Sequence, residues 1–264
     1  MSAVRTSKGF TLIELIMVMV ILGIILAVGS RFVLHAVDSY RSGEVENKVL
    51  GEGRLAMEQM TRYLRASVPN SLRVSASGNC IEFMPAVGGG NYIGSLPDSA
   101  NGAPLVSSIS TSPIVLDLGS ARHVVVGALF SSEIYTTAVP AARAGIGAVG
   151  SSPLTSISLA LPHRFVRNSI NKRVFIGDNP KRFCLSGNSL YIYENYGLLT
   201  SALNDANPGG SSALLATNVA ASGTAFSLSG GSEDRSAVAY ISLVFSRAQI
   251  SATLNQEVLV RNVP

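Results

Sequence analysis

The chain has 264 residues, of which 47% are hydrophobic and only 14% are charged. This composition excludes an intrinsically disordered chain, which needs low hydrophobicity and high charge. The two cysteines exclude a disulfide-rich mini-scaffold and a four-cysteine zinc site, and the net charge of +4 is too small to indicate a nucleic-acid binder by itself.

The N-terminal segment is apolar and long enough to cross a membrane. Residues Phe10–Ser30 contain one charge, Glu14, and would form a helix about 32 Å long, close to the thickness of a bilayer core. Arg5 and Lys8 precede this segment, so the positive-inside rule keeps the N-terminus in the cytoplasm and exports the rest. A signal peptide cleaved after Gly29 is the alternative, but its apolar run would be shorter and would not contain a costly carboxylate.

The start of this segment carries a motif. The residues Lys8-Gly9-Phe10-Thr11-Leu12-Ile13-Glu14 resemble the type IV prepilin motif, in which a short basic leader ends in Gly, Phe follows, and Glu is the fifth residue of the mature chain. The resemblance implies cleavage between Gly9 and Phe10 by a prepilin peptidase and N-methylation of Phe10. It also implies a leader over residues 1–9 and a mature chain from Phe10 to Pro264.

Glu14 is an assembly residue on chemical grounds as well. Cleavage after Gly9 creates an ammonium at Phe10, and Glu14 lies one helical turn further on the same face. A carboxylate in an apolar environment needs a counter-charge, and this ammonium is the cation made nearby. The pair can form within one chain or between neighbouring subunits, and the second arrangement would set the axial register of a filament.

Residues 31–66 continue the helix in a different composition. This stretch has no Pro, and its apolar residues recur at intervals of three and four, which predicts an amphipathic helix. The pattern predicts one helix from about Phe10 to Ala66, with Gly53 as one weak point that costs up to about 1 kcal/mol against Ala. Its charged face is either a surface for neighbouring subunits or a solvated face opposite the stripe that covers the protein's own sheet.

Beyond Pro69 the chain changes to short β-like runs. Ser186–Ser189 predicts a hairpin turn, and Ala237–Phe245, which is apolar on both faces, predicts a central strand. The other expected strands are Cys80–Met84, Ile114–Leu118, His123–Val126, Ser156–Leu161, Arg173–Ile176, Phe183–Leu185, Leu190–Tyr193, Ala225–Leu228 and Glu257–Val260. The expected loops are Gly88–Gly90, Asn207–Ser212 and Ser229–Asp234.

These elements predict an α+β fold, in which a long N-terminal helix packs on a mainly antiparallel sheet. The segments are the leader 1–9, a membrane or filament-core helix 10–30, its amphipathic continuation 31–66 and an exported β-rich domain 67–264. Cys80–Pro85 resembles minor prepilins of the PilW and pseudopilin J type, and Glu257–Pro264 resembles those of mannose-sensitive haemagglutinin pili. The resemblance implies a pilin-like fold, an inner-membrane location before assembly, a final place in a pilus, and other minor and major pilins as partners.

Two candidate features lie in the exported domain. Cys80 and Cys184 form one disulfide in an oxidising compartment, or remain two buried thiols. Six basic residues between His163 and Phe183 form a candidate contact surface for another minor pilin or, with interleaved Phe side chains, for nucleic acid; the alternative is a pair of solvated edge strands. The six are Arg164, Arg167, Lys172, Arg173, Lys181 and Arg182.

The sequence contains none of the common catalytic or metal-binding motifs. No His has a Cys, Asp or Glu at metal-ligand spacing, and no nucleophile elbow or phosphate-binding loop occurs; Gly88–Gly90 has no Lys-Ser/Thr after it and reads as a turn. We therefore expect no enzyme activity, no metal and no cofactor. The competing functions are a minor pseudopilin of a type II secretion system and a tip adhesin that binds sugar or DNA.

Overall fold

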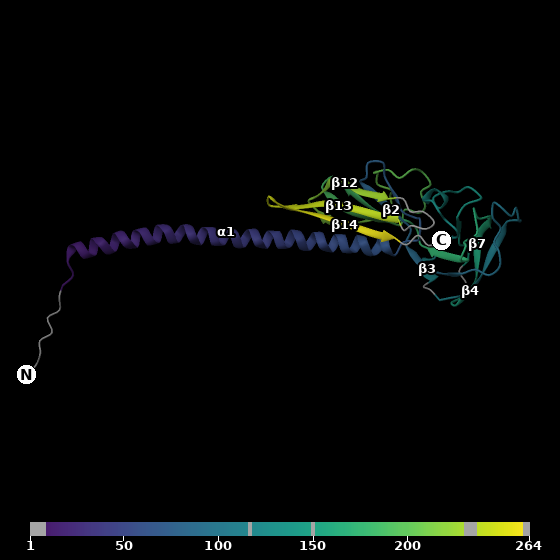
Figure 1. The fold of residues 1–264 in the computed structure, drawn as a ribbon, viewed down its shortest axis with the longest axis horizontal. Helices are drawn as coiled ribbons and strands as arrows, with labels where there is room; N and C mark the ends of the chain where they lie inside the picture. Colours follow the sequence, from purple (N-terminus) through teal and green to yellow (C-terminus); the bar gives the residue numbers. More distant parts are fainter. Residues whose placement is uncertain (1–8, 116–117, 149–150, 230–236, 261–264) are drawn as a thin grey trace, which may run out of the picture. The chain divides into compact units, whose positions relative to one another are not determined.

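The computed structural model describes residues 9–115, 118–148, 151–229 and 237–260. One long helix is followed by strands (Figure 1). The elements are α1 Leu12–Arg65, β1 Arg73–Val74, β2 Cys80–Phe83, β3 Ala86–Asn91, β4 Val106–Ile114, β5 His123–Val125, β6 Arg143–Gly145, β7 Leu154–His163, β8 Arg173–Gly177, β9 Lys181–Ser186, β10 Ser189–Glu194, β11 Ser211–Thr217, β12 Val219–Ser229, β13 Ala237–Arg247 and β14 Ile250–Val260, with short 3-10 turns at Leu118–Ser120 and Ser131–Glu133.

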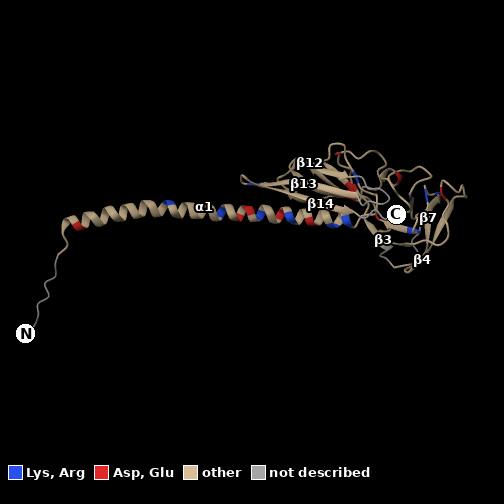
Figure 2. Cartoon of the chain, viewed as in Figure 1, with Lys and Arg blue, Asp and Glu red and all other residues tan. Residues whose placement is uncertain are grey.

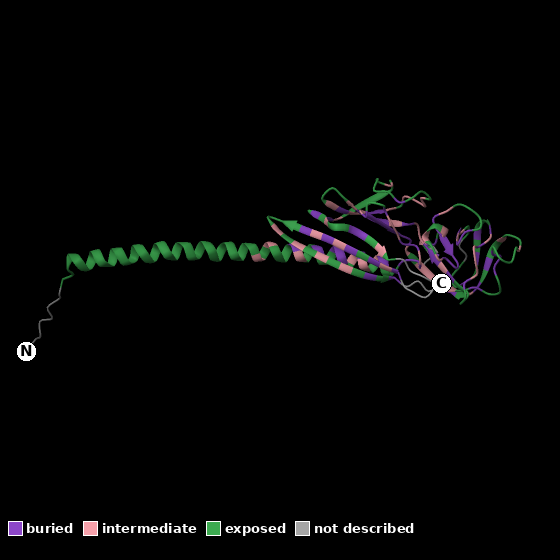
Figure 3. Cartoon of the chain, turned by 45° about the horizontal axis from the view of Figure 1, so that its top comes forward, coloured by how far each residue is buried: buried purple, intermediate pink, exposed green. Residues whose placement is uncertain are grey.

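Tertiary contacts divide the chain into two units, residues 1–48 and 49–264, with the division inside α1. In the first unit every residue from Gly9 to Ser42 is exposed (Figure 3). The charges of α1 are also unevenly distributed, because Glu14 is followed by no other charged residue before Arg31 (Figure 2). The expected helix continuation 31–66 is therefore divided between the two units. Its residues up to Lys48 belong to the first unit, and those from Val49 onward belong to the second.

In the second unit the last part of α1 packs against two antiparallel sheets. One sheet has the order β1-β2-β9-β10-β11 and the other β12-β13-β14, and β12 contacts β1, β2 and β9. The helix buries Val49, Gly53, Ala56, Met57, Met60 and Leu64. A Cβ atom on Gly53 would lie 2.6 Å from Cδ1 of Leu254 and 3.0 Å from Cδ2 of Phe245, so a larger residue would force these side chains to shift where the helix approaches β13 and β14.

The strands β3 to β8, which lie between β2 and β9 in the sequence, form a separate barrel. They pair in the order β3-β8-β5-β6 and as the antiparallel pair β4-β7. Two isolated bridges join these groups, Ile146 with Leu159 and Tyr92 with Thr111, so that six strands close into a ring. The ring has its own core, with Phe165, Val174 and Ile176 almost completely buried in it. Because β2 and β9 are direct neighbours, the six-stranded barrel is an insertion between two paired strands of the helix-covered body.

The predicted α+β class is confirmed, as are one continuous helix, the hairpin at Ser186–Ser189 and the central position of Ala237–Phe245. The prediction of a turn at Gly88–Gly90 is wrong, because these residues lie in β3. A Cβ atom on Gly90 would come within 2.7 Å of Ile114, so glycine serves close packing there. The expected strand Ile114–Leu118 is also wrong at Val115 and Leu118, since β4 ends at Ile114 and Leu118 begins a 3-10 turn; residues 116–117 lie outside the described residues. Most of the expected loop Ser229–Asp234 lies outside the described residues.

Candidate functional site

The bond between Gly9 and Phe10 lies just outside the helix. Both residues have no regular secondary structure and are exposed, with Phe10 at 79% of its full surface. A Cβ atom on Gly9 would meet no atom of the protein within 4 Å. The packing of the chain therefore does not require glycine at this position. Recognition of the small residue by a binding partner explains its presence better. Arg5 and Lys8 lie outside the described residues.

Thr11 and Glu14 form a reciprocal N-cap at the start of α1. The backbone N–H of Thr11 donates to Oε2 of Glu14 at 3.2 Å, and the backbone N–H of Glu14 donates to Oγ1 of Thr11 at 3.4 Å. The Thr11 hydroxyl also donates to Oε2 at 3.1 Å. This is a capping box, and its Thr-x-x-Glu spacing is a signal that the sequence alone carries.

The cap has a consequence for assembly. An N3 carboxylate that caps a helix points back toward the first turn. Glu14 is therefore held near Phe10, where cleavage after Gly9 would create the ammonium group. The helix N-terminus also carries a partial positive charge that favours a carboxylate. One side chain thus stabilises the helix start and places a negative charge at the end of the chain, so Glu14 has a structural role in addition to the expected assembly role.

Helix α1 is apolar enough to span a membrane. It contains an 18-residue window with a mean hydropathy of 2.9 and none of that window is buried within the protein. An apolar surface of this size is stable in a bilayer or against other apolar helices, and not in water. Together with the motif at its start, it indicates membrane anchoring.

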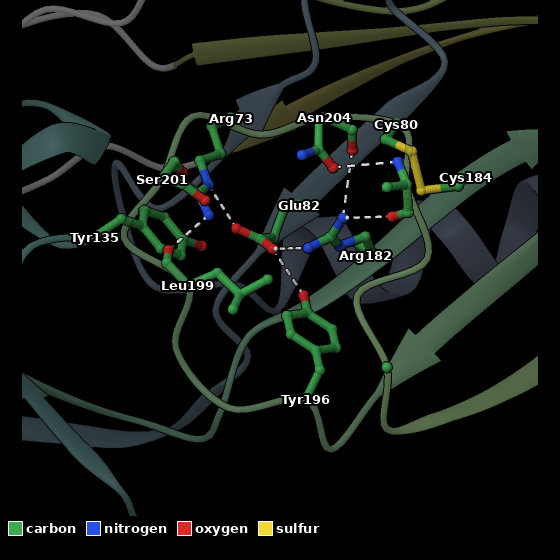
Figure 4. Close-up of polar contacts among 12 residues, drawn as sticks. Arg73, Cys80, Glu82, Tyr135, Arg182, Cys184, Tyr196, Leu199, Ser201 and Asn204 are labelled. Carbon is green, nitrogen blue, oxygen red and sulfur yellow. Dashed lines mark hydrogen bonds and ion pairs between the residues drawn. A yellow bond between two sulfur atoms is a disulfide. The ribbon is translucent and has the colours of Figure 1, made fainter.

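Cys80 and Cys184 are joined by a disulfide in the structure (Figure 4). They are directly opposite each other on β2 and β9, and both are buried. The bond lies three residue pairs from Phe83 and Lys181, where the chain leaves the helix-covered body for the barrel and returns from it. It therefore ties together the two strands at the base of the insertion.

The six basic residues do not form a shared surface. Lys172 and Arg173 are exposed, whereas the other four are buried or half-buried and have partners. Arg167 forms an ion pair of 2.6 Å with Glu133, and Lys181 one of 2.7 Å with Glu194. Burial by itself would raise the pKa of Glu133, but hydrogen bonds from Arg167 and from a backbone N–H outweigh it and lower the pKa.

Two of the aromatic side chains in this stretch are buried as well. Phe165 and Phe183 are fully buried in the protein, so neither can stack on a nucleic-acid base. Arg164 donates to the backbone carbonyl of Ala103 at 2.8 Å. The expectation of a basic contact surface is wrong for Arg182, which is 2% exposed, because its counter-charge lies on the neighbouring strand β2.

That counter-charge is Glu82, which is fully buried and holds two arginines (Figure 4). Oε2 accepts from Nε of Arg73 at 2.5 Å, and Oε1 lies 3.4 Å from Nη2 of Arg182. The Tyr196 hydroxyl donates to Oε1 at 2.9 Å, and burial, followed by the charge of Glu82, raises the pKa of this phenol. The Arg73 guanidinium also lies 3.9 Å from the ring centre of Tyr135.

The two arginines that pair with Glu82 also donate hydrogen bonds to backbone carbonyl groups. Arg73 donates to Ser201 at 2.8 Å and to Leu199 at 2.9 Å, and Arg182 donates to Asn204 at 3.3 Å. This charge network connects β1, β2 and β9 with the segment that follows β10. Apart from Nε of Arg182, which is buried without a hydrogen-bond partner in the described part of the chain, the guanidinium donors described above point at groups of the same chain, and this indicates a structural role.

The histidines are similarly engaged in structure. Arg143 can only donate, so Nδ1 of His123 accepts from it at 3.3 Å, and Nε2 carries the proton and faces Oδ1 of Asn179 at 3.2 Å. Burial and the Arg143 charge lower the pKa of His123 to about 4. Within the described ranges, no group of three or more His, Cys, Asp or Glu residues could hold a metal ion.

Comparison with known proteins identifies the N-terminal segment. The family described as the prokaryotic N-terminal methylation motif matches residues 4–30. No curated protein and no solved structure gives a significant match to the chain. The matched residues include Gly9, Phe10 and Glu14 and cover the whole of the expected membrane segment 10–30. The match supports a protein of the type IV pilin or pseudopilin kind, processed and methylated at its N-terminus.

Proposed function

We propose that this chain is a minor type IV prepilin that functions by being cleaved and built into a pilus or its tip complex. The observation that carries the proposal is the exposed Gly9–Phe10 bond directly before a capped helix whose apolar first part is fully exposed. The similarity of Glu257–Pro264 to minor prepilins of mannose-sensitive haemagglutinin pili favours the MshO type within this class; Arg261–Pro264 lies outside the described residues.

The proposed processing step is a hydrolysis carried out by a prepilin peptidase at the cytoplasmic face. Water adds to the carbonyl of Gly9, the bond to the nitrogen of Phe10 breaks, and the products are a leader carboxylate and the ammonium of Phe10. After the ammonium loses a proton, the free amine takes a methyl group from a sulfonium-class methyl donor, which leaves as a neutral thioether. Because Glu14 is held at the same helix end, it is placed to pair with an ammonium group of its own chain or of a neighbouring subunit.

The helix is proposed to exchange one apolar environment for another. Before assembly, the first part of α1 lies in the inner membrane with its N-terminus in the cytoplasm. On assembly it leaves the bilayer and packs among the helices of other minor and major pilins. The exported domain needs no catalytic group for this work, and we propose that the protein is not an enzyme.

The proposal is tested by blocking the cleavage site. In Gly9→Leu the larger side chain should stop cleavage, so the chain accumulates in the membrane as an unprocessed precursor. Gly29→Leu is the matched control, because Gly29 lies in α1 with open space around its Cβ position and cleavage there belongs to the signal-peptide alternative. Normal processing of Gly9→Leu, or loss of processing in Gly29→Leu, would contradict the proposal.

A further inference from the structure

The sheet that α1 covers ends in a long regular edge. Strand β14 pairs with β13 over 11 residues without a shift in register, and it is the last strand of its sheet. An edge strand of this kind presents unpaired N–H and C=O groups, which can pair with another extended chain. Proteins usually protect such edges with Lys, Pro, bulges or very short strands. β14 has no Lys or Pro, and its one charged residue is Glu257.

The other described strand edges are protected or closed. The barrel strands form a ring through their bridges. β1 has two residues, and the pairing of β11 with β10 contains a register shift. β12 is the other edge strand of the sheet that contains β14. Its register shifts between Ala221 and Phe226, and Gly223 has a φ of +80° there. Among the described strands, β14 is thus the long edge that has none of these protections.

A groove follows the middle of β14. Its volume is about 330 Å³, and it is lined by α1 and β14 without any residue of β13. The helix contributes Arg54, Met57, Glu58, Thr61 and Arg65, and the strand contributes Leu254, Asn255 and Gln256. A strand added at this edge would therefore lie over an apolar centre at Met57 with exposed arginines on the helix beside it.

We propose that the free edge of β14 binds an extended segment of a different polypeptide chain, which adds to the sheet as a further strand. Backbone hydrogen bonds to β14 would provide the affinity, as in other cases of strand addition. The side chains that face α1 would be small and apolar with an acidic residue near Arg54 or Arg65, because the groove carries two arginines against one glutamate, Glu58.

A second copy of this chain fits the edge poorly. In a parallel pair in register, Glu257 would lie beside Glu257 of the other copy, and like charges opposite each other destabilise a sheet. In an antiparallel pair of β14 strands, the two copies would point in opposite directions. The α1 helix of each copy would then reach its globular unit at Val49 from the opposite end. Chains that are anchored in one membrane or filament have their α1 helices on the same side, which excludes the antiparallel pair. In this respect the inference rests on the proposed function.

The test places a photoreactive benzoylphenylalanine at Thr253 of the full-length chain, in membranes of its native host. Thr253 is an exposed residue of β14, and Ser227, exposed on the bulged edge strand β12, is the control position. Irradiation at Thr253 should give an adduct with another polypeptide at a yield at least about tenfold above that at Ser227, a ratio that corresponds to about 1.4 kcal/mol. Mass spectrometry should place the adduct in an extended segment of that chain.

Charge added to the edge supplies the second arm. Ser251→Lys with Leu259→Lys should reduce the adduct at Thr253 by about tenfold or more, because lysines on an edge oppose strand addition. Ser227→Lys with Ser229→Lys on β12 should leave it unchanged. The absence of an adduct above the control, an adduct with β14 of a second copy, or an adduct that resists the β14 lysines would each overturn the inference.

The same samples separate this inference from the proposed function. The N-terminus of each cross-linked and free chain is read at the same time. A chain cleaved after Gly9 without an adduct overturns the strand-addition inference alone. A chain that forms the adduct but is not cleaved after Gly9 overturns the proposed function and leaves the edge contact standing.

Discussion

Neutralising Glu82 should strongly destabilise the β-rich domain. In Glu82→Gln the amide oxygen can still accept from Arg73, but the amide nitrogen then faces Arg182 and Tyr196. Arg182 is 2% exposed and cannot accept a hydrogen bond, so it is left as a buried charge without compensation. Removing one partner of a buried ion pair costs about 3–5 kcal/mol. Domains are stable by about 5–15 kcal/mol, so this loss is a large fraction of the total.

The assay is guanidinium unfolding of the detergent-solubilised, oxidised full-length chain, followed by circular dichroism because the chain has no Trp. Glu52→Gln is the matched control, since Glu52 pairs with Arg247 at 2.9 Å with both side chains about half exposed. An exposed pair of this kind contributes less than about 1 kcal/mol. Equal losses in the two variants would refute the reasoning that burial makes the Glu82 network important.

Three further predictions concern the cysteines, a histidine and the helix start. Because a disulfide joins Cys80 and Cys184, non-reducing and reducing gels of the native protein should differ in mobility, and maleimide labelling of the cysteines before reduction would contradict the disulfide. Because the folded pKa of His123 is about 4 and its unfolded value about 6.5, the unfolded chain takes up the proton first as pH falls, so stability should decrease by about 3 kcal/mol between pH 6.5 and 4. His123→Gln should abolish this decrease, and an unchanged pH profile would rule out His123 as its source. Glu14→Leu should be cleaved and inserted normally but enter the pilus poorly, since it removes the partner of the Phe10 ammonium; incorporation at wild-type levels would count against that pairing.

Local patterns in the sequence predicted the parts of the fold that depend on neighbouring residues. The spacing of apolar residues identified the helix to within two residues of its observed start at Leu12 and one of its end at Arg65. Alternation and β-branched content located most strands in the same way. The mistakes arose where tertiary contacts decide, as at Gly90, which looked like turn chemistry and instead lets Ile114 approach β3.

The candidate site shows the same division. The cleavage motif and Glu14 are contiguous in sequence, so their pattern was readable without a structure. The role of Arg182 could not be predicted from the sequence, because its partner Glu82 lies far away in the chain. Only the pairing of β2 with β9 brings the two residues together. The closure of the barrel was also unpredictable, since it depends on two isolated bridges between strands of different groups.

The most direct test of the central claim is mass spectrometry of the N-terminal peptide of this chain from native membranes and pili. The account predicts a mature chain that begins with N-methylated Phe10 and lacks residues 1–9. A mature N-terminus at Ser30, which a signal peptidase would produce by cleavage after Gly29, or a chain that keeps its leader in assembled pili, would contradict it.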